Sequence, residues 1–125
     1  MKAIRLIALA ACMAATLDAS AQEQEIRLFS HRGGRMEHDE NTLSAFQASY
    51  DAGYRGFETD IRMTRDGALV ITHDSSLERT TDGTGTVEEK TEAEIRQLAT
   101  KQGNKMMFLD ELLEFLKGKE GLYVE

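Results

Sequence analysis

Strand-like and helix-like segments alternate along this chain, and their order constrains the fold more than any other feature of the sequence. An apolar stretch at residues 26–30 predicts a strand that runs into a polar loop. A helix follows, capped by Asn41 or Thr42 and ended by Gly53, because its apolar residues recur at helical spacing. Residues 56–63 then alternate between apolar and polar side chains along one predicted strand. The order strand, helix, strand predicts a parallel α/β unit.

A tight turn and a second short strand follow at once. Residues 64–67 read Thr-Arg-Asp-Gly, and residues 68–72 form another apolar stretch. Four turn residues cannot make the long crossover that parallel strands require, so we predict an antiparallel hairpin inserted after the second strand. Further along, Thr91 and Glu94 form a capping box that opens a short helix.

The last part of the chain predicts one more helix and one more strand. Asp110 can cap a helix that carries three leucines on one stripe and is ended by Gly118. Residues 122–125 begin a strand, and a strand that stops there would leave an unpaired apolar edge. We therefore expect the N-terminal portion of a larger α/β domain, truncated within its third parallel strand.

The first 21 residues are typical of a secretory signal peptide. A short basic region precedes an apolar run at residues 6–17, and small residues at 19–21 suit cleavage by signal peptidase. The run is too short to span a bilayer, so we expect an exported protein, periplasmic or secreted, with no transmembrane segment in its mature chain. The folded domain would be residues 22–125. Anchoring as a lipoprotein through Cys12, the only cysteine, is the alternative, because the residues before it resemble a lipoprotein processing box.

The charge balance limits the partners that the domain can have. The chain carries 22 acidic side chains against 15 Lys and Arg, a formal net charge of −7. Such a balance offers no positive surface to nucleic acid or to an anionic membrane, although it suits a site that collects cations. We therefore expect no nucleic-acid partner.

Two carboxylates on the second predicted strand are the first candidates for chemistry. Glu58 and Asp60 are two residues apart, so they share one face of an extended strand. Carboxylates held together away from water repel each other unless a cation offsets their charge, and a hard divalent cation is their natural partner. An isolated pair of this kind is more often an ordinary solvated strand face.

Two histidines and an arginine are expected near these carboxylates. His31 and Arg32 follow the first strand at its carboxyl end, where ligands gather in parallel α/β folds. His73 ends the returning strand of the hairpin, and antiparallel pairing brings it opposite about Glu58. An imidazole can be acid or base near neutral pH, and a guanidinium offers phosphate a planar fork of donors. Together these residues predict a phosphate-handling site.

Successive short motifs of this chain resemble those of the glycerophosphodiester phosphodiesterase family. They lie at residues 29–33 (Phe-Ser-His-Arg-Gly), 40–46 (Glu-Asn-Thr-Leu-Ser-Ala-Phe), 57–61 (Phe-Glu-Thr-Asp-Ile), 64–67 (Thr-Arg-Asp-Gly), 72–74 (Thr-His-Asp) and 77–81 (Leu-Glu-Arg-Thr-Thr). The resemblance departs from the family at Asp39, where the family usually has proline, and in length. It implies the N-terminal portion of a (β/α)₈ TIM barrel of about 250 residues.

The resemblance also implies a role for each candidate residue. The family's acid/base pair corresponds to His31 and His73, and its phosphate-binding arginine to Arg32. Its metal-binding carboxylates correspond to Glu58, Asp60 and Glu125. Three carboxylates suit Mg²⁺ or Ca²⁺ better than Zn²⁺, so one of those two ions is the expected cofactor.

The implied reaction is metal-dependent hydrolysis of glycerophosphodiesters, which are deacylated phospholipids of lipid metabolism, to glycerol 3-phosphate and an alcohol. The expected partner is therefore a small-molecule substrate. Two alternatives stay open: a phospholipase C- or D-like phosphodiesterase that acts on intact lipid, and an inactive fragment or binding module. We expect these 125 residues alone to be inactive, because three strands cannot close a barrel of eight.

Overall fold

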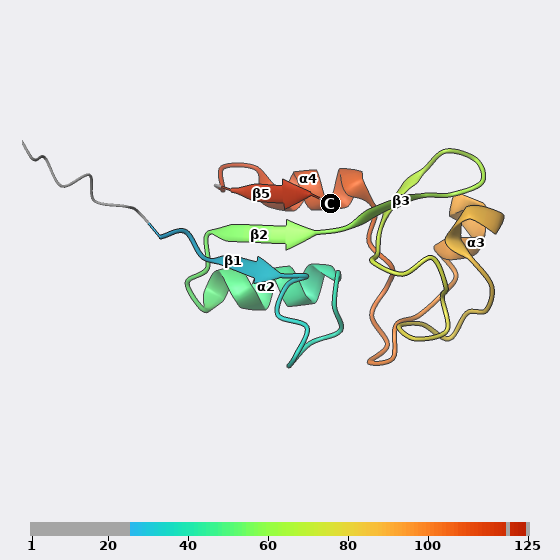
Figure 1. Cartoon of the computed structure of the whole chain (residues 1–125), viewed down its shortest axis with the longest axis horizontal. Coiled ribbons are helices and arrows are strands. Elements are labelled where there is room, and N and C mark those ends of the chain that lie inside the picture. The colour runs from blue at the N-terminus through green and yellow to red at the C-terminus, as the bar shows by residue number, and fades with distance from the viewer. Residues whose placement is uncertain (1–25, 120, 125) are drawn as a thin grey trace, which may run out of the picture.

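The computed structural model of this chain describes residues 26–119 and 121–124. The predicted signal peptide with Cys12 and the predicted metal ligand Glu125 lie outside these residues. Figure 1 shows a small sheet with two helices on one side of the molecule, and a hairpin with long loops on the other. No helix in the described part of the chain is long and apolar enough to cross a membrane.

Three parallel strands form the sheet, in the order β1, β2, β5. They are β1 (Phe29–His31), β2 (Gly56–Thr59) and β5 (Leu122–Val124). Ser30 of β1 pairs with Phe57 of β2, and Phe57 pairs in turn with Leu122 of β5. The predicted parallel α/β arrangement is confirmed. Because all three strands run the same way, their carboxyl ends meet at one edge of the sheet.

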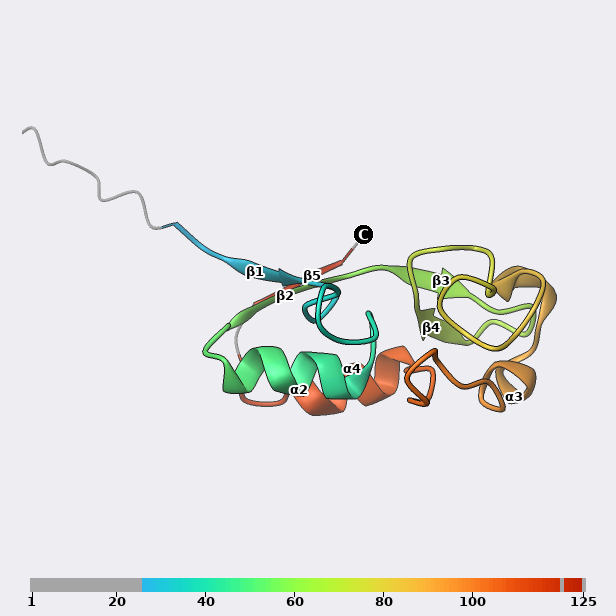
Figure 2. The same ribbon diagram turned by 90° about the horizontal axis from the view of Figure 1, so that it is seen from below.

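Two helices cover one face of this sheet and build its core. They are α2 (Leu43–Asp51), which follows β1, and α4 (Leu109–Leu116), which precedes β5. Both lie on the same side of the strands (Figure 2). Phe46 of α2, Phe57 of β2 and Leu112 of α4 belong to one fully buried cluster. The rings of Phe46 and Phe57 meet edge to face with centroids 5.9 Å apart, a favourable aromatic geometry. This packing holds β2 in place.

The predicted hairpin is present, but the strand that leads into it is broken. β3 (Ile61–Met63) pairs antiparallel with β4 (Leu69–Ile71), in a sheet separate from that of β2. The prediction of one strand over residues 56–63 is therefore wrong. The chain changes hydrogen-bonding partners at Asp60, and Thr59 and Asp60 are both buried although they are consecutive. A regular strand would turn such neighbours to opposite faces.

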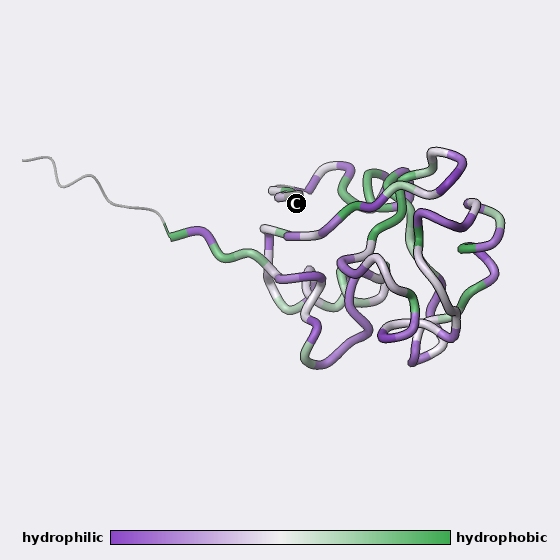
Figure 3. Tube along the Cα trace, turned by 45° about the vertical axis from the view of Figure 1, so that its right-hand side comes forward, coloured by the Kyte–Doolittle hydropathy of each residue, from purple (hydrophilic) through white to green (hydrophobic). Residues whose placement is uncertain are grey.

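The hairpin and the loops around it enclose a second core, the hairpin core. The 3₁₀ helix η1 (Val87–Glu89) and the short helix α3 (Glu92–Ile95) contribute to it. Its buried members are Val70, Leu77, Val87, Ile95, Met106 and Phe108. Thr91 caps α3 as predicted, because its Oγ1 accepts a hydrogen bond from Glu94 N at 3.3 Å. Figure 3 shows that the loops on the periphery of the molecule are mostly hydrophilic.

The segment that leads into α4 ties the two cores together. Met106 and Phe108 pack in the hairpin core, whereas Met107 between them packs in the core of the sheet. Ile71 N of β4 donates a hydrogen bond to Met107 O at 2.9 Å. The hairpin is therefore held firmly beside the sheet.

Asp110 does not cap α4, contrary to the prediction. The N-cap is Phe108, and Asp110 lies within the first turn. The carboxylate of Glu111 accepts a hydrogen bond from Phe108 N at 2.8 Å. The pairing of Phe108 with Val70 of β4 keeps Phe108 extended, so the helix starts directly after it.

Candidate active site

The loop after β1 presents His31 and Arg32 at the carboxyl edge of the sheet. Arg32 N donates a hydrogen bond to Glu58 O of β2 at 3.0 Å. Arg32 has a φ of 53° and Gly33 a φ of 78°, so the chain turns in the left-handed region that favours glycine. A Cβ at Gly33 would lie 2.8 Å from Ala45 Cβ, because the loop packs directly on α2. The backbone that carries both side chains is therefore closely fixed.

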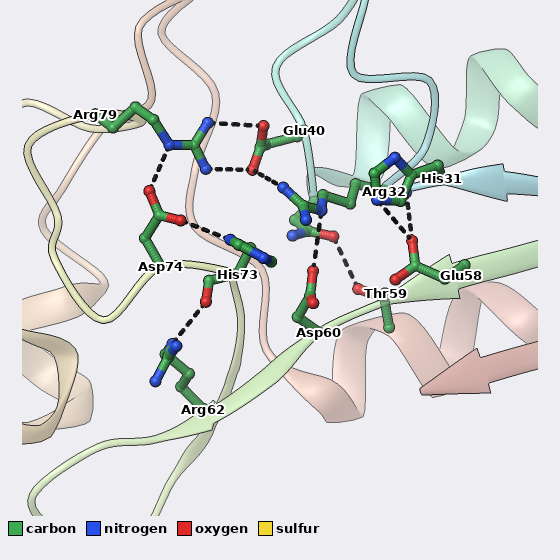
Figure 4. A network of polar contacts seen from close by, with 11 residues as sticks. His31, Arg32, Glu40, Glu58, Thr59, Asp60, Arg62, His73, Asp74 and Arg79 are labelled. Atoms are coloured by element: carbon green, nitrogen blue, oxygen red, sulfur yellow. Dashed lines mark hydrogen bonds and ion pairs between the residues drawn. The ribbon is translucent and has the colours of Figure 1, made fainter. Parts of the chain in front are cut away.

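The guanidinium of Arg32 lies buried between two carboxylates (Figure 4). Its Nη1 donates to Glu40 Oε1 at 3.2 Å, and its Nε lies 3.2 Å from Asp60 Oδ2. Nε and Oδ2 are buried without a hydrogen-bond partner, so their contact is one of charge rather than of hydrogen-bond geometry. A buried guanidinium needs such opposite charges, since its desolvation is otherwise costly.

Glu58 and His31 face each other beside this arginine. Oε2 of Glu58 accepts a hydrogen bond from Arg32 N at 3.1 Å and lies 3.7 Å from Nε2 of His31. The side chain of Glu58 is 13% exposed, whereas that of His31 is 51% exposed. The carboxylate is thus shielded while the imidazole reaches solvent.

His73 approaches the same region from the end of the hairpin (Figure 4). Its Nδ1 lies 2.6 Å from Asp74 Oδ1, and its backbone oxygen accepts from Arg62 Nε at 2.8 Å. Thr72 N, just before it, donates to Asp60 O at 3.0 Å, which continues the hairpin pairing toward β2. His73 therefore lies opposite about Thr59, one position from the predicted partner Glu58.

Arg79 joins the two parts of the site. Its Nη1 and Nη2 donate to the two oxygens of Glu40 at 2.9 Å and 2.7 Å, and its Nε donates to Asp74. The hydrogen bond from Arg79 holds the pKa of Glu40 below its ordinary value of 4.5. Hydrogen bonds from Arg79 and then from His73 hold the pKa of Asp74 well below its ordinary range. Both carboxylates, Glu40 first, raise the pKa of Arg79. The three groups form a charged network that stays ionised near neutral pH.

Sequence reasoning identified His31, Arg32 and His73 but missed this network. Glu40 and Arg79 do occur within two of the short motifs, which was the available signal. Their contact, however, joins positions 39 apart. Only the tertiary arrangement of the two loops brings them together.

Glu58 and Asp60 carry oxygen donors of the kind that a hard cation requires. Both side chains are largely shielded, and Oδ2 of Asp60 lacks a hydrogen-bond partner. Over residues 26–119 and 121–124, no group of three or more His, Asp or Glu side chains is placed to hold a metal ion. The predicted third ligand, Glu125, falls outside those ranges.

Comparison with known proteins identifies the family. Residues 31–123 match the glycerophosphoryl diester phosphodiesterase family, so the match includes every described residue of the candidate site. The chain belongs to this family. Its sheet and hairpin are accordingly the N-terminal portion of the family's barrel fold, as predicted.

Individual relatives agree with this assignment. The chain is 41% identical over 71 residues to the glycerophosphodiester phosphodiesterase of Caldanaerobacter subterraneus subsp. tengcongensis, covering 57% of this chain and 29% of the relative. It is 44% identical over 73 residues to human glycerophosphodiester phosphodiesterase 1, covering 58% of this chain and 22% of the relative. The chain thus spans less than a third of the length of both proteins.

Solved structures show the same relationship. The glycerophosphodiester phosphodiesterase of Agrobacterium tumefaciens superposes with a TM-score of 0.76 at 34% identity, over 80% of this chain and 46% of that one. A phosphodiesterase of Oleispira antarctica, solved in complex with the product sn-glycerol-3-phosphate, superposes with a TM-score of 0.74 at 31% identity. That match covers 79% of this chain and 43% of the other.

Proposed function

We propose that this protein hydrolyses glycerophosphodiesters to glycerol 3-phosphate and an alcohol by histidine acid–base catalysis. The observation that carries the proposal is the placement of Arg32 at the carboxyl edge of the sheet, with Glu58, Asp60 and His31 around it. Membership of the glycerophosphoryl diester phosphodiesterase family supports the same reaction. So does the product found in the Oleispira antarctica relative.

Arg32 is the proposed phosphate-binding residue. Its guanidinium is buried, and Glu40 and Asp60 flank it, so its plane is oriented before any substrate arrives. A planar guanidinium can donate two parallel hydrogen bonds to phosphoryl oxygens. Pre-oriented donors stabilise charge that develops on those oxygens without first having to reorganise.

The two histidines are the proposed acid and base. Their side chains are 51% and 45% exposed, so both can exchange protons with a bound substrate. One imidazole would accept the proton of the attacking glycerol 2-hydroxyl while the other protonates the departing alcohol, and water would then open the cyclic phosphate to give glycerol 3-phosphate. Nε2 of His31 lies beside Glu58, and Nδ1 of His73 beside Asp74. Either histidine can fill either role.

A divalent cation, Mg²⁺ or Ca²⁺, is the proposed cofactor. The buried oxygen of Asp60 that lacks a hydrogen-bond partner and the shielded carboxylate of Glu58 fit a hard ion. Glu58 and Asp60 would hold it, with Glu125 as the third ligand. A bound cation polarises a phosphate oxygen and lowers the pKa of a coordinated hydroxyl.

Replacement of the histidines tests the proposed reaction. In the product of the complete reading frame, His31→Ala and His73→Ala should each lower turnover of glycerophosphocholine by about 10²- to 10⁴-fold, because general acid–base catalysis contributes that much. Release of glycerol 3-phosphate and choline measures the rate, and His38→Ala is the matched control. Turnover near that of the wild type in either variant would contradict the assignment. Faster release of choline or phosphocholine from phosphatidylcholine than of choline from glycerophosphocholine would indicate a phospholipase that acts on intact lipid instead.

A further inference from the structure

Arg79 contacts two loops that carry different parts of the candidate site. Glu40 lies in the loop after β1 and binds both Arg79 and Arg32. Asp74 lies at the end of the hairpin and binds both Arg79 and His73. We propose that Arg79 is a positioning residue that, through these two carboxylates, orients Arg32 and His73 together. The inference rests on the proposed function, because it assigns those two residues to the reaction.

The contact with Glu40 fixes the carboxylate that holds Arg32. Both oxygens of Glu40 accept from Arg79, and Oε1 also accepts from Arg32 Nη1. A carboxylate held at both oxygens cannot rotate freely, so it presents Oε1 to Arg32 in one orientation. The side chains of Glu40 and Arg32 are only 10% and 11% exposed, so water competes weakly for this contact. The orientation of Arg32 therefore depends on that of Arg79.

The contact with Asp74 determines which ring nitrogen of His73 carries the hydrogen. Asp74 is a carboxylate near neutral pH and can only accept hydrogen bonds, and the hydrogen bond from Arg79 Nε to its Oδ2 holds its Oδ1 toward His73. Nδ1 of His73, 2.6 Å from Asp74 Oδ1, must then carry the hydrogen. A neutral imidazole with hydrogen on Nδ1 has its lone pair on Nε2, and that nitrogen is left for proton transfer. Arg79 thus favours one tautomer of His73 as well as one orientation.

An arginine suits this task better than a lysine. Three nitrogens of one rigid plane serve two carboxylates from two loops, Glu40 through Nη1 and Nη2 and Asp74 through Nε. A lysine ammonium is a single charge on a flexible stem and cannot reproduce this fork. Charge alone would therefore not preserve the arrangement.

Arg79→Gln tests the proposal through two independent measurements. The first is the ¹⁵N chemical shifts of the His73 imidazole, which report its tautomer and need no turnover. We expect hydrogen on Nδ1 in the wild type and a mixture of the two tautomers in Arg79→Gln. The second is hydrolysis of glycerophosphocholine, for which we expect kcat/KM to fall about 10- to 100-fold, as for other residues that orient a reacting group.

Arg96→Gln is the matched control. Arg96 also contacts two carboxylates, those of Glu92 and Glu111, but these belong to α3 and α4 rather than to the two loops of the site. Both readouts should stay within about twofold of the wild type in this variant. If Arg79→Gln does not fold by circular dichroism, Arg79→Lys takes its place, with the same tautomer mixture and a smaller loss of kcat/KM expected.

The tautomer measurement separates failure of this inference from failure of the proposed function. A wild type that does not hydrolyse glycerophosphodiesters would overturn the proposed function, whereas the His73 spectrum would still show whether Arg79 controls its tautomer. An unchanged tautomer in the Arg79 variant, together with an unchanged kcat/KM, would overturn the positioning role. So would a spectrum that changes equally in Arg96→Gln.

Discussion

At the scale of single residues, charge compensation decides how the candidate site is held. Arg32 and Arg79 alternate with Asp60, Glu40 and Asp74 in one connected series of contacts. Each guanidinium lies between two carboxylates, so neither arginine leaves an uncompensated charge in a partly buried place. These ion pairs therefore help to hold the folded site together. Their contribution to the free energy of unfolding must depend on the ionisation of the carboxylates.

The stabilisation that Glu40 provides should disappear in acid. Arg79 lowers the pKa of Glu40 in the folded chain, whereas the unfolded chain has the ordinary value of 4.5. The contribution is therefore complete above that value and is lost as the pH falls through the lower folded pKa. Urea unfolding from pH 7 to pH 3 should show a difference between wild type and Glu40→Gln that is constant above about pH 5 and shrinks below pH 4. A difference that grows in acid would contradict the ionised network.

At the scale of elements, most local signals were readable from the sequence and partner choice was not. The local cap predicted at Asp110 failed because Phe108, which pairs with Val70, caps the helix instead. The capping box of Thr91 and the four-residue turn of the hairpin are local, and both predictions hold.

The break at Asp60 was not visible, because apolar and polar residues alternate through it even though the chain changes from one sheet to another. The Arg79–Glu40 contact could not be predicted either, because it depends on where two loops meet in the folded chain.

The close approach of the β1 loop to α2 should make Gly33 sensitive to substitution. A Cβ there would lie 2.8 Å from Ala45 Cβ, at a φ of 78° that side chains rarely adopt. Gly67 has a φ of 91° with nothing within 4 Å, so Gly67→Ala measures the cost of backbone strain alone. We expect Gly67→Ala to cost about 1–2 kcal/mol of unfolding free energy and Gly33→Ala about 1–3 kcal/mol more. If both variants lose the same free energy of unfolding in urea, the loop is not packed closely enough on α2 to exclude a Cβ at position 33.

At the scale of the whole molecule, the hairpin is joined to the sheet by a shared segment rather than by a flexible linker. Met107 packs in one core while its neighbours Met106 and Phe108 pack in the other. His73 and Asp74 at the end of the hairpin are thereby held near the loop after β1, to which Arg79 links Asp74 through Glu40. The face of the sheet opposite α2 and α4 carries no helix in the described part of the chain (Figure 2).

The most direct test of the account is whether a hard cation binds at the sheet edge. Carboxylate sites of this kind also take Mn²⁺, whose paramagnetism broadens the NMR signals of nearby nuclei. Titration of the complete protein with Mn²⁺ should broaden the signals of His31, Glu58 and Asp60 first, and Glu58→Gln should abolish this. Broadening that begins instead at the exposed acids Glu88 and Glu89, and persists in Glu58→Gln, would contradict the proposed site.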